Sequence, residues 1–202
     1  IGLGEVIKPF QKPHPPIAVS LRGEKSGLAK LAGSRGWIPI SGNFIPAKII
    51  ASHWPTYAEE ADKHGLRVSP ETWRVGRSIL ITESEDQANE IINNQYSVFS
   101  DYYYYLNLHL KMVQGDIERN FDPVKEREEA FLIAKEQVTI GTASKVLDQL
   151  VEFYEVVGEF GYLNVTMHDI SADPDLWKSS MQTLAEEVVP HFGQHMKFSL
   201  KS

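Results

Sequence analysis

The sequence predicts a single α/β domain, spanning residues 1–202, in which parallel strands alternate with helices. Two observations lead to this class. Short apolar runs of strand length recur between segments whose apolar residues repeat every three or four positions, and Gly or Pro residues separate the two kinds of segment. Such alternation is typical of a parallel sheet whose strands are joined by crossover helices.

The first half of the chain contains three of the four strands that we expect. Residues 1–16 are loop-like, because their prolines lack a backbone donor and disfavour helix. In the first helix, Leu28, Leu31 and Ala32 are expected on the buried face. The three strands are expected at 17–20, 37–41 and 74–82, and the helices that follow them at 27–34, 45–64 and from 84 onward.

The second half of the chain holds one predicted strand and an irregular stretch. We interpret residues 97–135, which include four consecutive tyrosines, as an excursion from the main scaffold. Thr142 or Ser144 can cap the helix that follows, a strand is expected at 162–167, and a last helix over 175–190 ends at a proline. Four strands are about half of those in a (β/α)₈ barrel. The count is therefore compatible with a half-barrel and with a complete four-stranded open sheet.

Composition and charge exclude several classes of function. The chain has 20 Lys and Arg against 27 Asp and Glu, a formal net charge of −7, whereas nucleic-acid binding needs clustered Lys and Arg. It has no Cys, and so no disulfide, thiolate metal site or Cys nucleophile. Its apolar runs are far shorter than the ~20 residues of a membrane span, and we assign no metal site. We expect a soluble, cytoplasmic protein that binds neither nucleic acid nor membranes.

The turn after the first strand carries the most informative side chains. Ligands of parallel α/β folds meet the carboxyl ends of the strands. Glycines there allow a close approach, cations neutralise charge, and a helix N-terminus offers free N–H groups, so the turn suits a phosphate. The alternative is a capped helix behind a solvated, charged turn. The residues concerned are Ser20, Arg22, Gly23, Lys25, Ser26 and Gly27.

Two further strand ends carry candidate site residues. Ser41, Asn43 and Phe44 follow the second strand, as either a rim loop that touches a cofactor or substrate or a simple strand-to-helix turn. His168 follows the last strand, where an imidazole can exchange a proton near neutral pH or can simply be packed. His53 is expected on the surface of its helix.

Seven segments resemble one known family in their order and spacing. They are Pro9 to Ser20; Leu31-Ala32-Gly33 with Gly36 to Ser41; His53-Trp54 with Tyr57; Trp73 to Arg77; Ile140-Gly141-Thr142 with Val146 and Gln149-Leu150; Gly161 to Asp169; and Ser180-Met181 with Leu184 to Pro190. Together they resemble the bacterial-luciferase-like, flavin-dependent monooxygenases, in particular the subgroup of limonene 1,2-monooxygenase-like and alkanal monooxygenase-like proteins. The resemblance extends over nearly the whole chain.

The resemblance implies the C-terminal half of a TIM (β/α)₈ barrel, strands five to eight, with the N-terminal half absent. It implies that reduced FMN binds at the carboxyl ends of the strands and that the turn after strand five helps to hold its phosphate. Here that turn departs from the family's usual small residues by carrying Arg22, Glu24 and Lys25, and Glu24 would repel a phosphate unless it points away. The implied cofactor-binding residues are Ser20, Arg22, Gly23, Lys25, Ser26, Gly27 and Ser41, and the implied substrate rim is Asn43, Phe44 and His168.

The implied activity is that of an FMN-dependent monooxygenase, which uses O₂ to oxygenate a small organic substrate. A flavin reductase is expected to supply the reduced flavin, and a homo-oligomer is expected. Most of the catalytic apparatus is implied in the absent half, so His168 is the one catalytic candidate here and the isolated chain is expected to be inactive and to associate through an apolar edge. The alternatives are an F420-type, deazaflavin-dependent oxidoreductase on the same barrel and a non-catalytic half-barrel that serves in binding or assembly.

Overall fold

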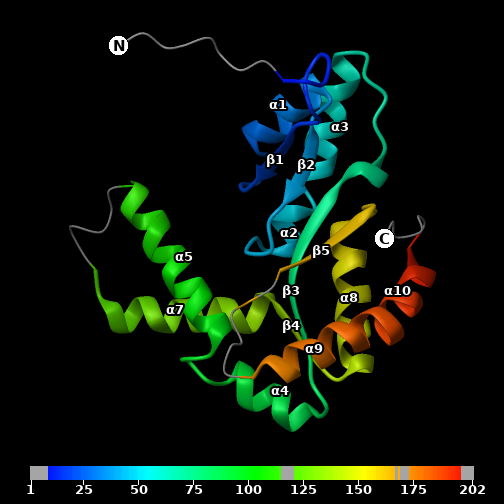
Figure 1. Cartoon of the computed structure of the whole chain (residues 1–202). Coiled ribbons are helices and arrows are strands. Elements are labelled where there is room, and N and C mark those ends of the chain that lie inside the picture. The colour runs from blue at the N-terminus through cyan, green and yellow to red at the C-terminus, as the bar shows by residue number, and fades with distance from the viewer. Residues whose placement is uncertain (1–8, 115–120, 167, 169–172, 197–202) are drawn as a thin grey trace.

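A parallel sheet of five strands organises the chain in the computed structural model, which describes residues 9–114, 121–166, 168 and 173–196 (Figure 1). Every pairing between the strands is parallel, so the predicted α/β class is confirmed, although the sheet has one strand more than expected. The strands are β1 (Ala18–Leu21), β2 (Ile38–Ser41), β3 (Arg74–Ile81), β4 (Val138–Gly141) and β5 (Tyr162–Thr166).

Strand β4 is the one that the sequence analysis missed. It begins at Val138, directly after a helix that ends at Gln137, with no Gly or Pro between them. Elements are separated in a sequence by such residues. The four buried residues of β4 follow the helix without a break, so the sequence pattern does not distinguish them as a separate strand.

Strand β3 is central and pairs with three other strands. Residues 74 and 75 pair with β2, residues 74–78 with β5, and residues 78–81 with β4. A strand has two edges, and a residue pairs with one neighbour on each. Because β5 overlaps both β2 and β4, it occupies one edge of β3, and β2 and β4 follow one another along the other edge. The carboxyl ends of β2 and β5 therefore lie beside Val75 and Ser78, before the end of β3 itself.

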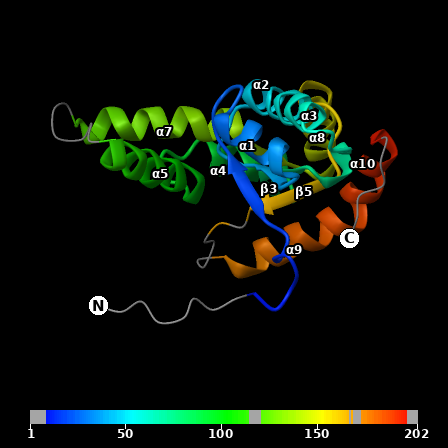
Figure 2. The ribbon, with the colours of Figure 1, turned by 90° about the horizontal axis from the view of Figure 1, so that it is seen from above.

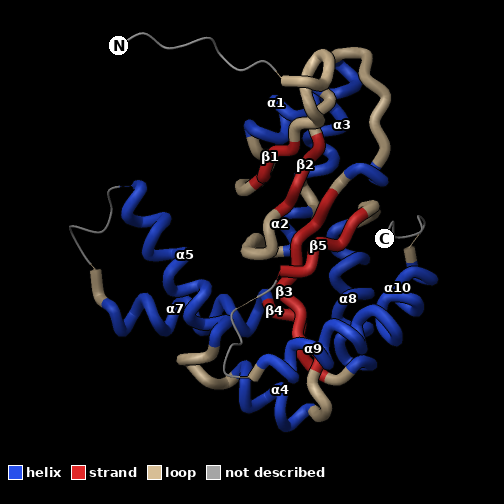
Figure 3. Tube along the Cα trace, in the orientation of Figure 1, coloured by secondary structure: helices blue, strands red, loops and turns tan. Residues whose placement is uncertain are grey.

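Helices connect the strands and cover the sheet (Figure 3). Seen from above, α1, α3 and α8 lie on one side of the sheet and α9 lies on the other (Figure 2). None of the described helices combines the length and the apolarity that crossing a lipid bilayer requires. The helices are α1 (Gly27–Arg35), α2 (Ala47–Ile50), α3 (His53–Lys63), α4 (Glu85–Ile92), α5 (Val98–Gln114), α7 (Pro123–Gln137), α8 (Ala143–Val157), α9 (Pro174–Thr183) and α10 (Val189–His195), with a 3₁₀ turn at Pro70–Thr72 and a π-helical turn at Leu184–Val188.

Helix α1 packs through small residues rather than through the predicted leucines. Ala32 is fully buried as expected, whereas Leu28 and Leu31 are 43% and 41% exposed, so their predicted burial was wrong. The reason is the close approach of α3: a Cβ atom on Gly33 would lie 2.4 Å from the carbonyl oxygen of Tyr57. Backbones this close leave no room for a leucine between them, so the contact face is made of alanine and glycine.

Two predicted helix boundaries were wrong, and both lie near a proline. The helix expected over 45–64 is divided into α2 and α3, because Pro55 has no N–H to donate and its ring opposes the carbonyl four residues earlier. Pro55 lies instead in the first turn of α3, where its missing donor is tolerated. The last helix does not end at Pro190; a π-helical turn precedes this proline and α10 continues to His195.

The predicted excursion forms an arm of two helices, α5 and α7, which pack against each other and project from the sheet (Figures 1 and 2). An ion pair between Asp101 and Arg127 links the two helices. At the base of the arm, Phe99 and Tyr103 are buried in one cluster with Leu80 of β3. The arm is thus anchored to the sheet by its aromatic residues.

The main core lies between β3 and α8 and extends to the C-terminal helices. Its fully or nearly fully buried members are Ile45, Ile50, Trp73, Val75, Ile79, Ile81, Val146, Leu150, Phe153, Val157, Phe160, Leu184, Val188, Phe192 and Met196. This core fixes β3, and β3 in turn fixes the strand ends at which the candidate site lies.

Candidate functional site

The turn after β1 brings six of the predicted cofactor-binding residues together at the carboxyl end of a parallel strand. Ser20 and residues 22–25 are exposed. Lys25, rather than one of the glycines, has the left-handed backbone of the turn, with φ 47°, a conformation that is uncommon for a residue with a side chain. Its N–H donates to Ser52 Oγ at 3.0 Å, immediately before α3. This bond holds the turn against the start of α3.

The first turn of α1 is open toward solvent. Ser26 occupies the N-cap position, but its side chain makes no capping hydrogen bond, and no acidic residue lies in the first helical turn. A Cβ atom on Gly23 or Gly27 would meet no other atom within 4 Å. The helix therefore presents free N–H groups and the positive end of its dipole at an unobstructed surface. An anion of the size of a phosphate can approach this surface.

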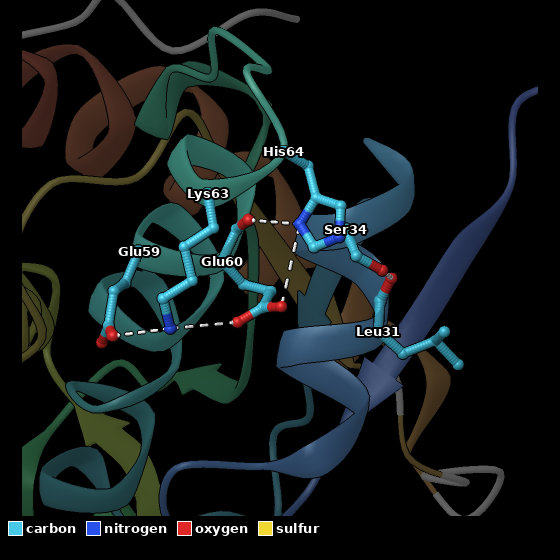
Figure 4. Close-up of polar contacts among 6 residues, drawn as sticks. All are labelled: Leu31, Ser34, Glu59, Glu60, Lys63 and His64. Atoms are coloured by element: carbon cyan, nitrogen blue, oxygen red, sulfur yellow. Dashed lines mark hydrogen bonds and ion pairs between the residues drawn. The ribbon is translucent and has the colours of Figure 1, made fainter.

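A cavity of about 340 Å³ adjoins the turn between α1 and α3, with Lys25 among its lining residues. Two carboxylates also line it, Glu59 and Glu60. Lys63 contacts both, at 2.8 Å and 3.3 Å, and His64 donates to the backbone carbonyl of Glu60 at 2.9 Å (Figure 4). The ion pairs with Lys63 offset part of the negative charge that Glu59 and Glu60 place near the turn. Exposed ion pairs of this kind contribute little to the stability of the fold.

A buried histidine connects this turn with the end of β2 and, through it, with the residue immediately before β3. His53 Nε2 donates to the carbonyl oxygen of Gly23 at 3.0 Å. In the neutral ring Nδ1 is then an acceptor, and it receives the hydroxyl proton of Ser41 at 2.8 Å. Ser41 Oγ accepts in turn from Trp73 Nε1 at 3.0 Å. Burial lowers the pKa of His53, which favours this neutral form.

The expected surface position of His53 was wrong, because its side chain is 0% exposed. The helix break before α3 starts a new helix at His53 and turns its ring toward β2. Ser41 is also 0% exposed, and its hydroxyl is engaged on both sides by His53 and Trp73. Ser41 therefore lies behind the turn and does not face its open surface.

A second polar cluster joins the ends of β2 and β5. Asn43 Nδ2 donates to Ser78 Oγ at 2.9 Å, and His168 Nε2 lies 2.8 Å from the same oxygen. All three residues are buried, and burial lowers the pKa of His168 to about 4, so its ring is neutral at pH 7. Asn43 and His168 were predicted at two separate strand ends. Ser78, which sequence reasoning missed, brings them together, and its only signal was a hydroxyl within an apolar strand.

Aromatic residues of the arm cover this cluster. The rings of Phe99 and Tyr102 lie edge-on to the His168 ring, with centroids 4.9 Å and 4.8 Å away. The Tyr102 hydroxyl donates to Asn43 Oδ1 and the Tyr103 hydroxyl to the Asn43 carbonyl, both at 3.3 Å. Burial raises the pKa of Tyr103, so the phenol stays protonated. The base of the arm is therefore part of the candidate site, a role that the run of four tyrosines did not reveal by sequence.

The loop after β2 lies between the two clusters. It follows Ser41, which bonds with His53, and carries Asn43 of the second cluster; the ring of its Phe44 lies 5.9 Å from the guanidinium of Arg22. The turn after β1 and the predicted substrate rim are thus neighbours. A charged turn and a hydrogen-bonded aromatic cluster therefore lie next to each other at the carboxyl ends of the strands.

A further cavity of about 530 Å³ lies at the end of β3 and does not suit a phosphate. Its charged lining residues are all acidic, namely Glu83, Asp173, Asp175 and Glu187. Carboxylates repel a phosphate, whereas the turn after β1 offers two cations and a helix N-terminus. We therefore place the candidate cofactor site at the turn.

Comparison with known proteins identifies distant relatives. No protein family model matches the sequence. The chain is 26% identical over 197 residues to 4-hydroxyprotoasukamycin monooxygenase of Streptomyces nodosus subsp. asukaensis, covering 92% of this chain and 49% of the relative. It is 25% identical over 185 residues to 3,6-diketocamphane 1,6-monooxygenase of Pseudomonas putida, covering 90% and 48%. The chain thus spans about half the length of these relatives.

Solved structures share the fold. The oxygenating constituent of 3,6-diketocamphane monooxygenase from Pseudomonas putida, a type II Baeyer-Villiger monooxygenase in complex with FMN, matches with a TM-score of 0.69 and 24% identity over 93% of this chain and 50% of that one. An F420-dependent secondary alcohol dehydrogenase matches with a TM-score of 0.50 and 18% identity over 84% and 48%. Together with the sequence relatives, these matches confirm the resemblance to luciferase-like flavin-dependent monooxygenases.

Proposed function

We propose that this chain holds FMN in a flavin-dependent monooxygenase that uses O₂ to oxygenate a small organic substrate. The observation that carries the proposal is the turn after β1, where Arg22, Lys25 and the uncapped start of α1 meet at the carboxyl end of a parallel strand. The monooxygenase relatives support the reaction class. Bound FMN would supply the oxygen chemistry, and the protein would bind and orient it.

The residues present fit the phosphate of FMN. Arg22 and Lys25 are exposed cations, and the space around Gly23 and Gly27 is open. Glu24 is an exposed carboxylate in the same turn and opposes the anion. Because two cations and the helix dipole act against one carboxylate, the net field favours the phosphate. We propose that Arg22, Lys25, Ser26 and the N–H of Gly27 contact it, that Ser20 borders it, and that Ser41 supports the turn from behind.

The aromatic cluster is proposed as the substrate rim. Phe44, Asn43 and His168 lie at the ends of β2 and β5, next to the phosphate turn, and Phe99 and Tyr102 cover His168. The aromatic side chains around this rim would exclude water from the reacting atoms and receive an organic substrate. His168 is neutral at pH 7, so it would act as a hydrogen-bonding group there rather than as a cation.

We propose further that β1, β2, β3 and β5 correspond to strands five to eight of a (β/α)₈ barrel, with β4 as an additional strand. Among the described residues, β1 has a strand neighbour on one edge only, and Ala18 and Ser20 are exposed on it. The match to about half of each relative agrees with this assignment. The single-domain organisation, the flavin reductase partner, the homo-oligomer and the cytoplasmic location stay predictions.

The deazaflavin alternative is weaker, because both sequence relatives are monooxygenases and the F420-dependent neighbour shares only the fold. The non-catalytic alternative predicts that no flavin binds. Equilibrium binding of FMN and of F420, followed by flavin fluorescence, separates the three functions. We expect binding of FMN in preference to F420, for this chain alone or combined with an N-terminal half-barrel.

Charge variants of the turn test the assigned residues. Arg22→Gln and Lys25→Gln are expected to weaken FMN binding several-fold, and Glu24→Gln to strengthen it, because the first two remove attraction for the phosphate and the third removes repulsion. Lys178→Gln, at an exposed position of α9, is the matched control and should leave the affinity unchanged. Equal affinities for all four variants would contradict the assignment of the phosphate to this turn.

A further inference from the structure

We propose that His53 is a positioning residue that holds the turn after β1 in the conformation that binds phosphate. This inference rests on the proposed function for the identity of the anion, and on hydrogen bonds for the rest. His53 makes no contact with the proposed ligand surface itself, because it is fully buried. It acts through the backbone of Gly23, whose carbonyl oxygen accepts from Nε2 at 3.0 Å.

The turn needs such a support, because its own conformation is unfavourable. Lys25 has a positive φ of 47°, which costs about 1 kcal/mol for a residue with a Cβ atom. The turn contains Gly23, and Gly27 follows it; glycine loses more conformational entropy on ordering than other residues. The described contacts that oppose these costs are the bond from Lys25 N to Ser52 Oγ and the bond from His53 to Gly23. Both come from the start of α3.

The support is rigid because His53 is itself held by Ser41 at the end of β2, and Ser41 is held by Trp73 immediately before β3. A carbonyl accepts only, so Nε2 carries the proton and Nδ1 must accept. Ser41 of β2 donates to Nδ1 and accepts from Trp73, whose indole N–H can only donate. The direction of every bond from Trp73 to Gly23 is therefore fixed. The ring cannot rotate without breaking one of them inside the core.

Two substitutions separate the two halves of this connection. The amide nitrogen of His53→Gln can take the place of Nε2 and keep the bond to Gly23, while it loses the bond to Ser41. The amide oxygen of His53→Asn can take the place of Nδ1 and keep the bond to Ser41, but it is too short to reach Gly23. Both variants are neutral and polar, but Asn also leaves the larger cavity, so a general loss of packing has to be separated from an effect on the turn by comparing the turn with a distant site.

Limited proteolysis measures the turn without any ligand. Trypsin cleaves after Arg22 and Lys25, both within the turn, and after Lys178 in α9, which reports opening elsewhere. When opening is fast, cleavage follows the population of the locally open form. We expect His53→Asn to raise cleavage in the turn at least fivefold relative to Lys178, and His53→Gln to change it less than twofold. Equal changes in both variants would overturn the proposal.

Binding of FMN and of riboflavin, which lacks the phosphate, tests the consequence for the ligand. We expect His53→Asn to weaken FMN binding several-fold with little effect on riboflavin, and His53→Gln to retain the preference for FMN. A loss of affinity that is equal for the two flavins would contradict a role through the phosphate turn. If the unsubstituted protein does not prefer FMN over riboflavin, the proposed function fails instead, and the proteolysis still decides whether His53 holds the turn.

Discussion

Asn43 and Ser78 are joined by a hydrogen bond of 2.9 Å from Asn43 Nδ2 to Ser78 Oγ, which ties the loop after β2 to the middle of β3. Ser78 also bonds with His168, so three segments far apart in the chain meet at one hydroxyl. Tyr102 and Tyr103 add bonds from the arm to Asn43. The proposed substrate rim is therefore held by buried polar bonds to the central strand, and its geometry depends on them.

Removing this shared hydroxyl is expected to destabilise the fold. Ser78→Ala leaves Asn43 Nδ2 without its acceptor and His168 Nε2 without its partner, and an unsatisfied buried polar group costs about 1–3 kcal/mol. We expect the free energy of unfolding, from urea titration, to fall by about 2 kcal/mol. Ser144→Ala, at an exposed position in α8, is the control and should change it by less than ~0.5 kcal/mol. A similar loss in both variants would contradict the role of Ser78.

Acid is expected to destabilise the protein through His168. Burial lowers the pKa of His168 in the folded state to about 4, below its ordinary value of 6.5. Between these values the unfolded chain binds the proton and the folded chain does not. The contribution of His168 is therefore fully present above pH 6.5 and declines as the pH falls toward 4, by about 1.4 kcal/mol per pH unit at most.

The measurement is the difference between the unsubstituted protein and His168→Gln, because carboxylates also titrate in this range. Gln keeps a hydrogen-bonding atom near Ser78 but does not titrate. Unfolding free energies at pH 7 and pH 5 should show a steeper decline for the unsubstituted protein. Parallel declines would show that His168 does not resist protonation in the fold. Burial also lowers the pKa of His53. Because His53 is present in both proteins, its contribution to the pH dependence cancels from the comparison.

Most of the succession of strands and helices along the chain, and the charged turn, could be predicted from the sequence because each is a local pattern. Apolar runs bounded by Gly and Pro located β1, β2, β3 and β5, and the turn after β1 was visible as glycines and cations at a strand end. The confirmed elements are those in which local propensity and the tertiary fold agree. The resemblance then added the cofactor that these patterns alone do not identify.

The parts that escaped prediction depend on contacts between distant segments. His53 looked like a surface residue because its burial follows from a helix break and from Ser41, twelve positions earlier. Ser78 became significant only through Asn43 and His168, which β3 brings together. Leu28 was assigned to the core because apolarity alone does not show that a glycine contact excludes it. Long-range hydrogen bonds and close backbone contacts leave no periodic signal.

The contact between α1 and α3 predicts opposite behaviour for two glycines of α1. A Cβ atom on Gly33 would lie 2.4 Å from a backbone carbonyl, so Gly33→Ala must push the helices apart. We expect a net loss of about 1–3 kcal/mol in the free energy of unfolding, as in overpacked cores. Gly27→Ala, which meets no atom within 4 Å, should be neutral or slightly stabilising, because alanine favours helix. If Gly33→Ala also proved neutral, α1 would not pack as tightly as described.

The attachment of α9 to the sheet gives a final test of the fold near the C-terminus. Ser180 Oγ accepts the backbone N–H of Ile81 at 2.8 Å, although the two residues lie 99 positions apart. This bond lies at the end of β3 and holds α9 against it. Ser180→Ala leaves a buried N–H unsatisfied and is expected to lower the free energy of unfolding by about 1–3 kcal/mol. It should also raise the amide exchange rate of Ile81 far more than that of Thr82, whose N–H donates to the Gly141 carbonyl of β4.

The neighbouring serine provides the matched control for this test. Ser179 is exposed on the same helix, so Ser179→Ala makes the same chemical change without touching the sheet. Its free energy of unfolding and its exchange at Ile81 should both stay at the level of the unsubstituted protein. Because the two variants differ only in which side of α9 loses a hydroxyl, a faster exchange in both would show that α9 lies across β3 in another rotation.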